Sequence, residues 1–224
     1  MVVLPPRARA PTRLQSPLLL VSSGREDGGL VYETLGDSAA QGVGASRPEL
    51  GYVGLIAAEL SARTGMSVQI INLSRSGACI RDVVTVQLPV LGALDIHPDL
   101  VTVDIGANDI PTYKADRFAL DAKVLTKALP AGTFIADVPY FMHGHWERNA
   151  QQAADLLTTS ARQHGMTIVP LHEALHAEGK RAMLTDFAPD WFHPNDRGHR
   201  VWARTFEATI AASTPSRQLR TPSN

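Results

Sequence analysis

Three side chains in this sequence have the types and spacing needed for nucleophilic acyl transfer. A serine hydroxyl is a weak nucleophile until a histidine takes its proton, and that histidine needs an acceptor on its other ring nitrogen. Ser38 lies just past an apolar run, and Asp190 lies three residues before His193. Pro189 and Pro194 flank that second segment, which favours a rigid turn over a long helix. The sequence therefore predicts Ser38 as nucleophile, His193 as general base and Asp190 as the partner of the histidine.

The same chemistry needs hydrogen-bond donors for a tetrahedral oxyanion, each worth about 3 kcal/mol of the barrier in typical cases. Three candidates follow predicted strands: the backbone N–H groups of Ser38 and Gly77 and the side-chain amide of Asn108. Glycine suits such a position because its backbone amide can approach a substrate closely. The sequence thus predicts an oxyanion hole at Ser38, Gly77 and Asn108. Supporting rather than catalytic roles are expected for Asn72, Ser74, Asp109 and His199.

Short β-rich apolar runs alternate with longer stretches of helical periodicity. Strands are predicted at residues 30–35, 67–72, 100–105, 133–137 and 167–169. Amphipathic helices are predicted at residues 51–63, 81–91, 117–129, 147–164 and 197–212. This alternation is typical of an α/β fold with a parallel sheet covered on both faces, which binds ligands at the carboxyl ends of its strands. Ser38, Gly77 and Asn108 are expected to meet at that edge.

Four blocks in one order carry a resemblance to a known family. They are Gly36-Asp37-Ser38, residues 72–77, Gly106-Ala107-Asn108-Asp109 and Asp190-Trp191-Phe192-His193. Over residues 30–212 the chain resembles the SGNH or GDSL-type serine hydrolases. The resemblance implies a three-layer α/β/α sandwich with a flavodoxin-like parallel sheet of about five strands, metal-independent cleavage of esters or thioesters, and the site roles given above. Ala39 departs from the leucine in the family's name, at a position that packs behind the nucleophile in that family.

The residues and the resemblance together predict a metal-independent serine esterase that acts on short- to medium-chain carboxylic esters through an acyl-enzyme on Ser38, without a cofactor. A carbohydrate acetylesterase, a thioesterase and a lysophospholipase are open as alternatives. Tyr140 and Phe141 follow the fourth predicted strand, and Trp191 lies between the acid and the base, so these rings are expected to contact substrate. A connecting loop whose rings merely cover the helix below explains residues 140–146 equally well.

Composition favours a soluble globular protein. Hydrophobic residues make up 44% and charged residues 19% of the chain, as in proteins that bury an apolar core. The formal net charge of −1 gives no long-range attraction to nucleic acid or anionic membranes. The expected partner is therefore a small-molecule, lipid or glycan ester, and the oligomeric state is open. Cys79 is the only cysteine, so an intramolecular disulfide is excluded.

One hydrolase domain is expected at residues 29–212, followed by a disordered tail at 213–224 that is rich in Ser, Thr, Pro and Arg. Residues 1–28 are expected to form a flexible lead-in with at most one short strand at residues 18–22. The apolar run there is too short for the core of a signal peptide or for a bilayer span. A cytoplasmic location is therefore expected.

A motif of another class competes with the serine site. His172-Glu173-Ala174-Leu175-His176 matches the zincin pattern, in which two histidines one helical turn apart hold zinc beside a glutamate base. The longer metzincin pattern continues at Gly179 but fails at Ala182, where the third histidine belongs. A short surface helix explains the segment as well, so a zinc peptidase is the lesser hypothesis. A catalytically silent binding module with the same fold is the other alternative.

Overall fold

The computed structural model describes residues 28–213, except residues 95, 143 and 180. Nearly all of the expected lead-in, with its short strand, and the expected tail lie outside the described residues, so the domain boundaries stay predictions. No described helix is both long and apolar enough to cross a membrane. The cytoplasmic location also stays a prediction.

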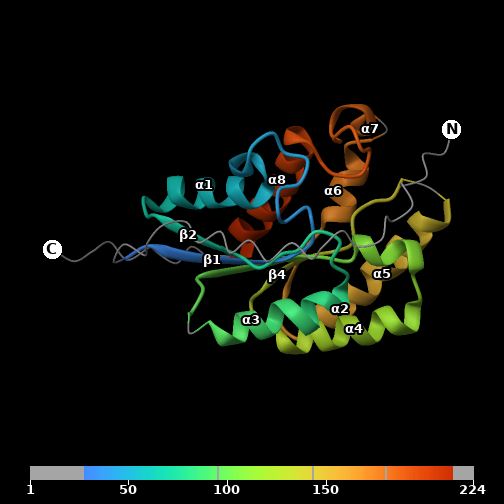
Figure 1. The fold of residues 1–224 in the computed structure, drawn as a ribbon, viewed down its shortest axis with the longest axis horizontal. Coiled ribbons are helices and arrows are strands. Elements are labelled where there is room, and N and C mark those ends of the chain that lie inside the picture. The colour runs from blue at the N-terminus through green and yellow to red at the C-terminus, as the bar shows by residue number, and fades with distance from the viewer. Residues whose placement is uncertain (1–27, 95, 143, 180, 214–224) are drawn as a thin grey trace.

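A five-stranded parallel sheet forms the centre of the molecule (Figure 1). Its strands are β1 (Leu30–Gly36), β2 (Val68–Asn72), β3 (Leu100–Asp104), β4 (Phe134–Ala136) and β5 (Thr167–Val169). They lie in the order β2-β1-β3-β4-β5, and every neighbouring pair is parallel. All residues of β3 are buried, as expected for a parallel sheet that is covered on both faces. The five predicted strands are confirmed to within one residue at each end.

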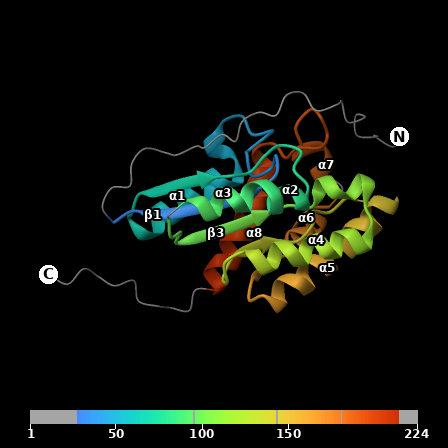
Figure 2. The same ribbon diagram turned by 60° about the horizontal axis from the view of Figure 1, so that its bottom comes forward.

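Helices cover both faces of the sheet and make the predicted three-layer sandwich (Figure 1). On one face lie α1 (Tyr52–Thr64) and α8 (Asp196–Ser213). On the other lie α3 (Leu88–Ala93), α4 (Ala115–Ala128) and α5 (Gly144–Gln163), and Figure 2 shows α4 beside α5. Three shorter helices are α2 (Ile80–Asp82), α6 (Leu171–Ala177) and α7 (Ala182–Thr185). Each layer buries its own apolar cluster against the sheet.

The prediction of a single regular helix at residues 81–91 was wrong in detail. The segment is instead α2, a π-helical turn at Val83–Gln87, and then α3. Two features account for this irregularity within the helical segment. Pro89 at the start of α3 has no N–H to donate to the preceding turn. The widened turn also places the side chain of Gln87 against the end of β1, where it makes two hydrogen bonds.

Glu33 in β1 is a carboxylic acid within the core. It is 1% exposed, and neither carboxyl oxygen has a hydrogen-bond partner among the described residues. Burial raises the pKa of Glu33 from its usual 4.5 to about 7, because the ionised form loses its hydration. The folded state holds this proton more tightly than the unfolded chain. The free energy of unfolding should therefore fall as the pH rises between those two pKa values.

Glu33→Met is expected to stabilise the protein at pH 8 by up to about 3 kcal/mol, and by much less at pH 4, where the wild-type carboxyl is protonated. Urea unfolding at both pH values measures the difference. Glu178→Met, at an exposed position after α6, serves as the control and should change little. An equal gain from Glu33→Met at both pH values would show that the charge of Glu33 is not the cause.

Candidate active site

Ser38 lies just past the end of β1, in the turn that follows Gly36, the last residue of the strand. Gly36 has φ of +149°, and a Cβ at this residue would come within 2.3 Å of the carbonyl oxygen of Asp104. A side chain therefore does not fit there. The Asp37 carboxylate accepts a hydrogen bond from the N–H of Ala39 (3.0 Å) and closes the turn. Ser38 itself is 4% exposed.

A buried side-chain amide fixes the backbone just before Ser38. Gln87 Nε2 donates to the carbonyl oxygen of Gly36 (2.8 Å), and Gln87 Oε1 accepts from the N–H of Gly36 (2.9 Å). The amide thus pairs with Gly36 much as the peptide of a neighbouring strand would. No short motif marks Gln87 in the sequence, because its partner lies far away along the chain.

The predicted acid and base are held together in a tight turn. Asp190 Oδ2 lies 2.6 Å from His193 Nδ1, and Asp190 Oδ1 accepts hydrogen bonds from the N–H groups of Phe192 and His193, both at 3.0 Å. An antiparallel bridge between Phe187 and Pro194 closes the base of the turn. Partial burial acts to raise the pKa of Asp190, but the bonds from His193 and Phe192 outweigh it and hold that pKa below its usual value. Asp190 is thus kept as a carboxylate.

The segment that carries His193 packs against the loop that follows Ser38. A Cβ at Gly44 in that loop would come within 2.2 Å of the Pro194 carbonyl oxygen and 3.1 Å of the His193 Cβ. Val43 donates its N–H to the carbonyl oxygen of Ser38 (3.0 Å). The hydroxyl of Ser38 makes no hydrogen bond to any described residue, so the expected bond to His193 is not formed in this structure. Catalytic hydrogen bonds often tighten only in the substrate complex.

His199 joins this loop to the two helices beyond it. Its Nδ1 accepts from the N–H of Tyr52 (3.3 Å), and its Nε2 donates to the carbonyl oxygen of Val43 (3.1 Å). Both ring nitrogens are therefore used by the neutral form. Burial lowers the pKa of His199, although its bond to Val43 acts in the opposite direction. The predicted structural role of His199 is confirmed.

His199→Gln is expected to make the free energy of unfolding less sensitive to acid. As the pH falls below about 6.5, the unfolded chain gains a proton that the buried His199 resists, so the wild-type protein loses stability. Glutamine can still donate and accept, but it does not titrate. Denaturant unfolding between pH 7.5 and pH 5 compares the slopes, with His97→Gln at an exposed position as the control. Parallel slopes for wild type and His199→Gln would contradict the expectation.

The three predicted oxyanion donors differ in what their hydrogens contact. Gly77 has φ of +77°, and apart from its two chain neighbours no described residue comes within 4 Å of where its Cβ would be. Among the described residues, no acceptor binds the N–H of Ser38 or of Gly77. The amide nitrogen of Asn108, in contrast, donates to Asp37 Oδ2 (3.1 Å) and to the carbonyl oxygen of Ala78 (3.0 Å). Asn108 would therefore have to exchange a present partner to serve an oxyanion.

The residues expected to support these loops do so. Asn72 Nδ2 donates to the carbonyl oxygen of Ala40 (2.7 Å), and Asn72 Oδ1 accepts from the N–H of Ser74 (3.0 Å) and from its hydroxyl. Asp109 Oδ2 accepts from the N–H of Ile80 at the start of α2 (3.0 Å). These contacts confirm that Asn72, Ser74 and Asp109 shape the loops around the predicted donors.

The three rings expected to contact substrate have different surroundings. Tyr140 lies edge-on to the rings of His172 and His176, with ring centroids 5.5 and 4.8 Å apart. Phe141 packs against the apolar cluster below α4 and α5. Trp191 is 52% exposed and has φ of +57°, which is an unusual backbone conformation for a bulky residue. Trp191 is thus the ring least engaged by the fold.

The zincin-like segment forms α6, as the surface-helix interpretation expects. His172 Nε2 lies 2.9 Å from Glu147 Oε1 of α5, and His176 packs against Tyr140. In the described part of the chain, no three His, Cys, Asp or Glu side chains gather as a metal site. The geometry of this segment gives no support to the zinc peptidase hypothesis.

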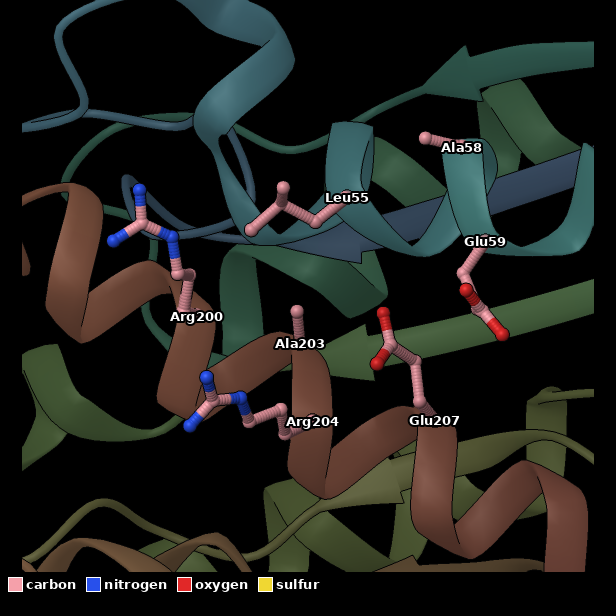
Figure 3. Close-up of a pocket in the computed structure, with 7 residues that line it drawn as sticks. All are labelled: Leu55, Ala58, Glu59, Arg200, Ala203, Arg204 and Glu207. Carbon is pink, nitrogen blue, oxygen red and sulfur yellow. The ribbon is translucent and has the colours of Figure 1, made fainter. Parts of the chain in front are cut away.

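A depression lies between α1 and α8 (Figure 3). It is lined by Leu55, Ala58, Glu59, Arg200, Ala203, Arg204 and Glu207. Burial and the charge of Glu59 raise the pKa of Glu207, although two arginines oppose the shift. None of the predicted site residues contributes to this depression.

Comparison with known protein families shows which family this chain belongs to. The model of the GDSL-like lipase/acylhydrolase family matches residues 34–201, which include Ser38, Gly77, Asn108, Asp190 and His193. The chain belongs to this family. As a GDSL-like acylhydrolase, it is an ester-hydrolysing enzyme, and the sequence-based family prediction is confirmed. No curated protein matches the chain.

Solved structures share the fold of this GDSL-like hydrolase. An α/β hydrolase from the metagenome of Lake Arreo, Spain, is 24% identical with a TM-score of 0.67, covering 84% of this chain and 97% of its own. An acetylxylan esterase from Geobacillus stearothermophilus is 24% identical with a TM-score of 0.66, covering 84% and 98%. A lipolytic G-D-S-L family member from Veillonella parvula is 18% identical with a TM-score of 0.66, covering 82% and 99%.

Proposed function

We propose that the protein is a metal-independent serine esterase that cleaves short- to medium-chain carboxylic esters through an acyl-enzyme on Ser38. The paired Asp190 and His193 carry the proposal. One oxygen of Asp190 is fixed by two backbone N–H groups while the other contacts His193 Nδ1. This arrangement favours the tautomer in which Nε2 can accept a proton. The close packing of Gly44 on Pro194 brings the same segment to the loop of Ser38.

In the proposed reaction, Ser38 Oγ attacks the ester carbonyl carbon while His193 Nε2 takes the hydroxyl proton. The carbonyl electrons move to oxygen, and the N–H groups of Ser38 and Gly77 donate to the resulting oxyanion. Asn108 joins them by releasing Asp37 or Ala78. The tetrahedral intermediate then collapses, and the bond to the alcohol breaks as His193 gives that oxygen the proton.

Water completes the proposed cycle. His193 Nε2 removes a proton from a water molecule, which attacks the carbonyl carbon of the acyl-enzyme on Ser38. The same N–H donors stabilise the second oxyanion. The bond to Ser38 Oγ then breaks, the serine recovers its proton from His193, and a carboxylic acid leaves. The carboxylate of Asp190 stabilises the imidazolium in both halves of the cycle.

A carbohydrate acetylesterase is the second candidate within the same chemistry. His193 protonates the departing alcohol, so rings beside His193 lie on the alcohol side of the ester. Phe192 contacts the ring of His193 edge-on at 5.1 Å, and neighbouring Trp191 is more than half exposed. Exposed aromatic faces suit the apolar faces of sugar rings, and the similar fold of an acetylxylan esterase points the same way. A thioesterase and a lysophospholipase would use the same catalytic groups.

Labelling with a fluorophosphonate tests the proposed function. The reagent should inactivate the purified protein and leave one phosphonyl adduct, which peptide mass spectrometry should locate on Ser38. A p-nitrophenyl ester series from acetate to palmitate, supplemented with acetylated xylooligosaccharides, reports the acyl and alcohol preferences. EDTA should not change the rates.

Three outcomes would contradict the proposal. An adduct on another serine would move the nucleophile. Loss of activity with EDTA alone would favour a metal-dependent site such as the one considered at His172 and His176. A protein that neither labels nor hydrolyses any ester would favour the silent binding module.

A further inference from the structure

Gln41 links the loop of Ser38 to the loop that carries Gly77. Its Nε2 donates to the carbonyl oxygen of Ser74 (2.9 Å), and its Oε1 accepts from both the N–H (3.0 Å) and the hydroxyl (2.6 Å) of Ser76. Gln41 lies three residues after Ser38, and its own N–H donates to the carbonyl oxygen of Asp37. One side chain therefore spans the two loops that supply the proposed backbone donors.

The turn that Gln41 holds is of a kind that can adopt two arrangements. Ala78 donates its N–H to the carbonyl oxygen of Arg75 (3.0 Å), which makes Ser76 and Gly77 the central residues of a β-turn. The φ of +77° at Gly77 is typical of a type II turn. Types I and II differ by a rotation of the central peptide, and that peptide carries the N–H of Gly77. A flip would therefore point this donor in the opposite direction.

We infer that Gln41 is a positioning residue for the oxyanion hole, because it holds the Ser76–Gly77 turn in the orientation that presents the N–H of Gly77. The inference rests on the proposed function. Gly36 and Ala40 also bind this loop through Arg75 and Asn72. Those two bonds hold the loop up to the first residue of the turn, whereas among the described residues only Gln41 hydrogen-bonds to Ser76, the first central residue.

An oxygen-to-sulfur exchange in the substrate tests this role. A thiocarbonyl sulfur is a weak hydrogen-bond acceptor, so a thionoester gains less from oxyanion donors than the matched oxygen ester. Gln41→Met removes all three hydrogen bonds at similar side-chain length. It should lower kcat for p-nitrophenyl acetate by about tenfold, less than the loss of a whole donor, with little change in KM. The rate of the Gln41→Met variant on p-nitrophenyl acetate, divided by its rate on p-nitrophenyl thionoacetate, should fall together with kcat.

Two further variants make the test specific. Gln41→Glu keeps the acceptor for Ser76 but loses the donor to Ser74, so its rate ratio should lie between those of Gln41→Met and wild type. Gln151→Met removes a glutamine hydrogen bond to Glu147 within α5 (2.8 Å) and should leave the ratio unchanged. Circular dichroism confirms that each variant is folded.

The outcomes separate this inference from the function on which it rests. A wild-type ratio in both folded Gln41 variants would overturn the role of Gln41, whether their rates stay unchanged or fall equally on both substrates. The esterase assignment would stand in either case. The esterase assignment is judged on the wild-type protein by the adduct on Ser38. Its failure would remove the basis for the role of Gln41 as well.

Discussion

Ser38→Ala is expected to lower kcat/KM for p-nitrophenyl acetate by at least about 10⁴-fold, because the acyl-enzyme needs the serine oxygen. A small residual rate would come from the remaining donors and from substrate binding. The hydroxyl of Ser38 bonds to no described residue, so its removal leaves no buried partner unsatisfied. The melting temperature should therefore move little, and the loss of activity can be assigned to the chemistry.

Activity and thermal unfolding are measured on the same samples of Ser38→Ala. Ser213→Ala provides the matched control, because Ser213 is the last residue of α8 and, within the described part of the chain, its hydroxyl bonds only to the carbonyl oxygen of Thr209. That variant should keep wild-type activity. A folded Ser38→Ala protein that hydrolyses the ester at a tenth of the wild-type rate or faster would refute the nucleophile assignment.

Asp190→Asn is expected to lower kcat by about 10³-fold with a smaller effect on KM. Asparagine retains an oxygen for the N–H groups of Phe192 and His193, but its NH₂ then faces His193 Nδ1. That contact favours the tautomer with the proton on Nε2, which cannot accept a proton from Ser38. The Asp190 side chain is 46% exposed, so water partly compensates and the expected loss is below the roughly 10⁴-fold typical of buried triads.

The kcat and KM of Asp190→Asn are measured with the same ester, beside Asp116→Asn as the control. Asp116 is an exposed acidic residue in the first turn of α4, and its neutralisation should leave the kinetics unchanged. If Asp190→Asn raised KM while kcat stayed at the wild-type value, Asp190 would belong to substrate binding rather than to the support of His193.

The fold was predictable from local patterns because each strand is a short apolar run with β-branched residues. β3 and β5 show this most clearly, and their predicted limits differ from the observed ones by at most one residue. The helix at 81–91 was mispredicted because periodicity alone does not distinguish a continuous helix from one widened by a π-turn. Pro89 lies within this segment, but the hydrogen bonds between Gln87 and Gly36 that accompany the π-turn join residues too far apart for any local window to contain.

The candidate site was predictable for residues that lie in short motifs and not for those that act across the chain. Residue type and spacing alone are enough to propose Ser38, Asp190 and His193 as a catalytic triad. Gln41 does not, since a glutamine in a turn is ordinary until Ser76 is found beside it. The two hydrogen bonds of Asn108 could likewise not be predicted from the sequence, because Asp37 and Ala78 approach Asn108 only in the folded chain.

The packing of Pro194 on Gly44 has a consequence for how activity arises during folding. The proposed nucleophile lies near the first strand, whereas the proposed base lies just before the last helix, so the site is assembled from opposite ends of the domain. Contacts between such distant segments form late, because a long loop must close first. Recovery of esterase activity during refolding should therefore lag behind recovery of helical signal and report the docking of the C-terminal segment.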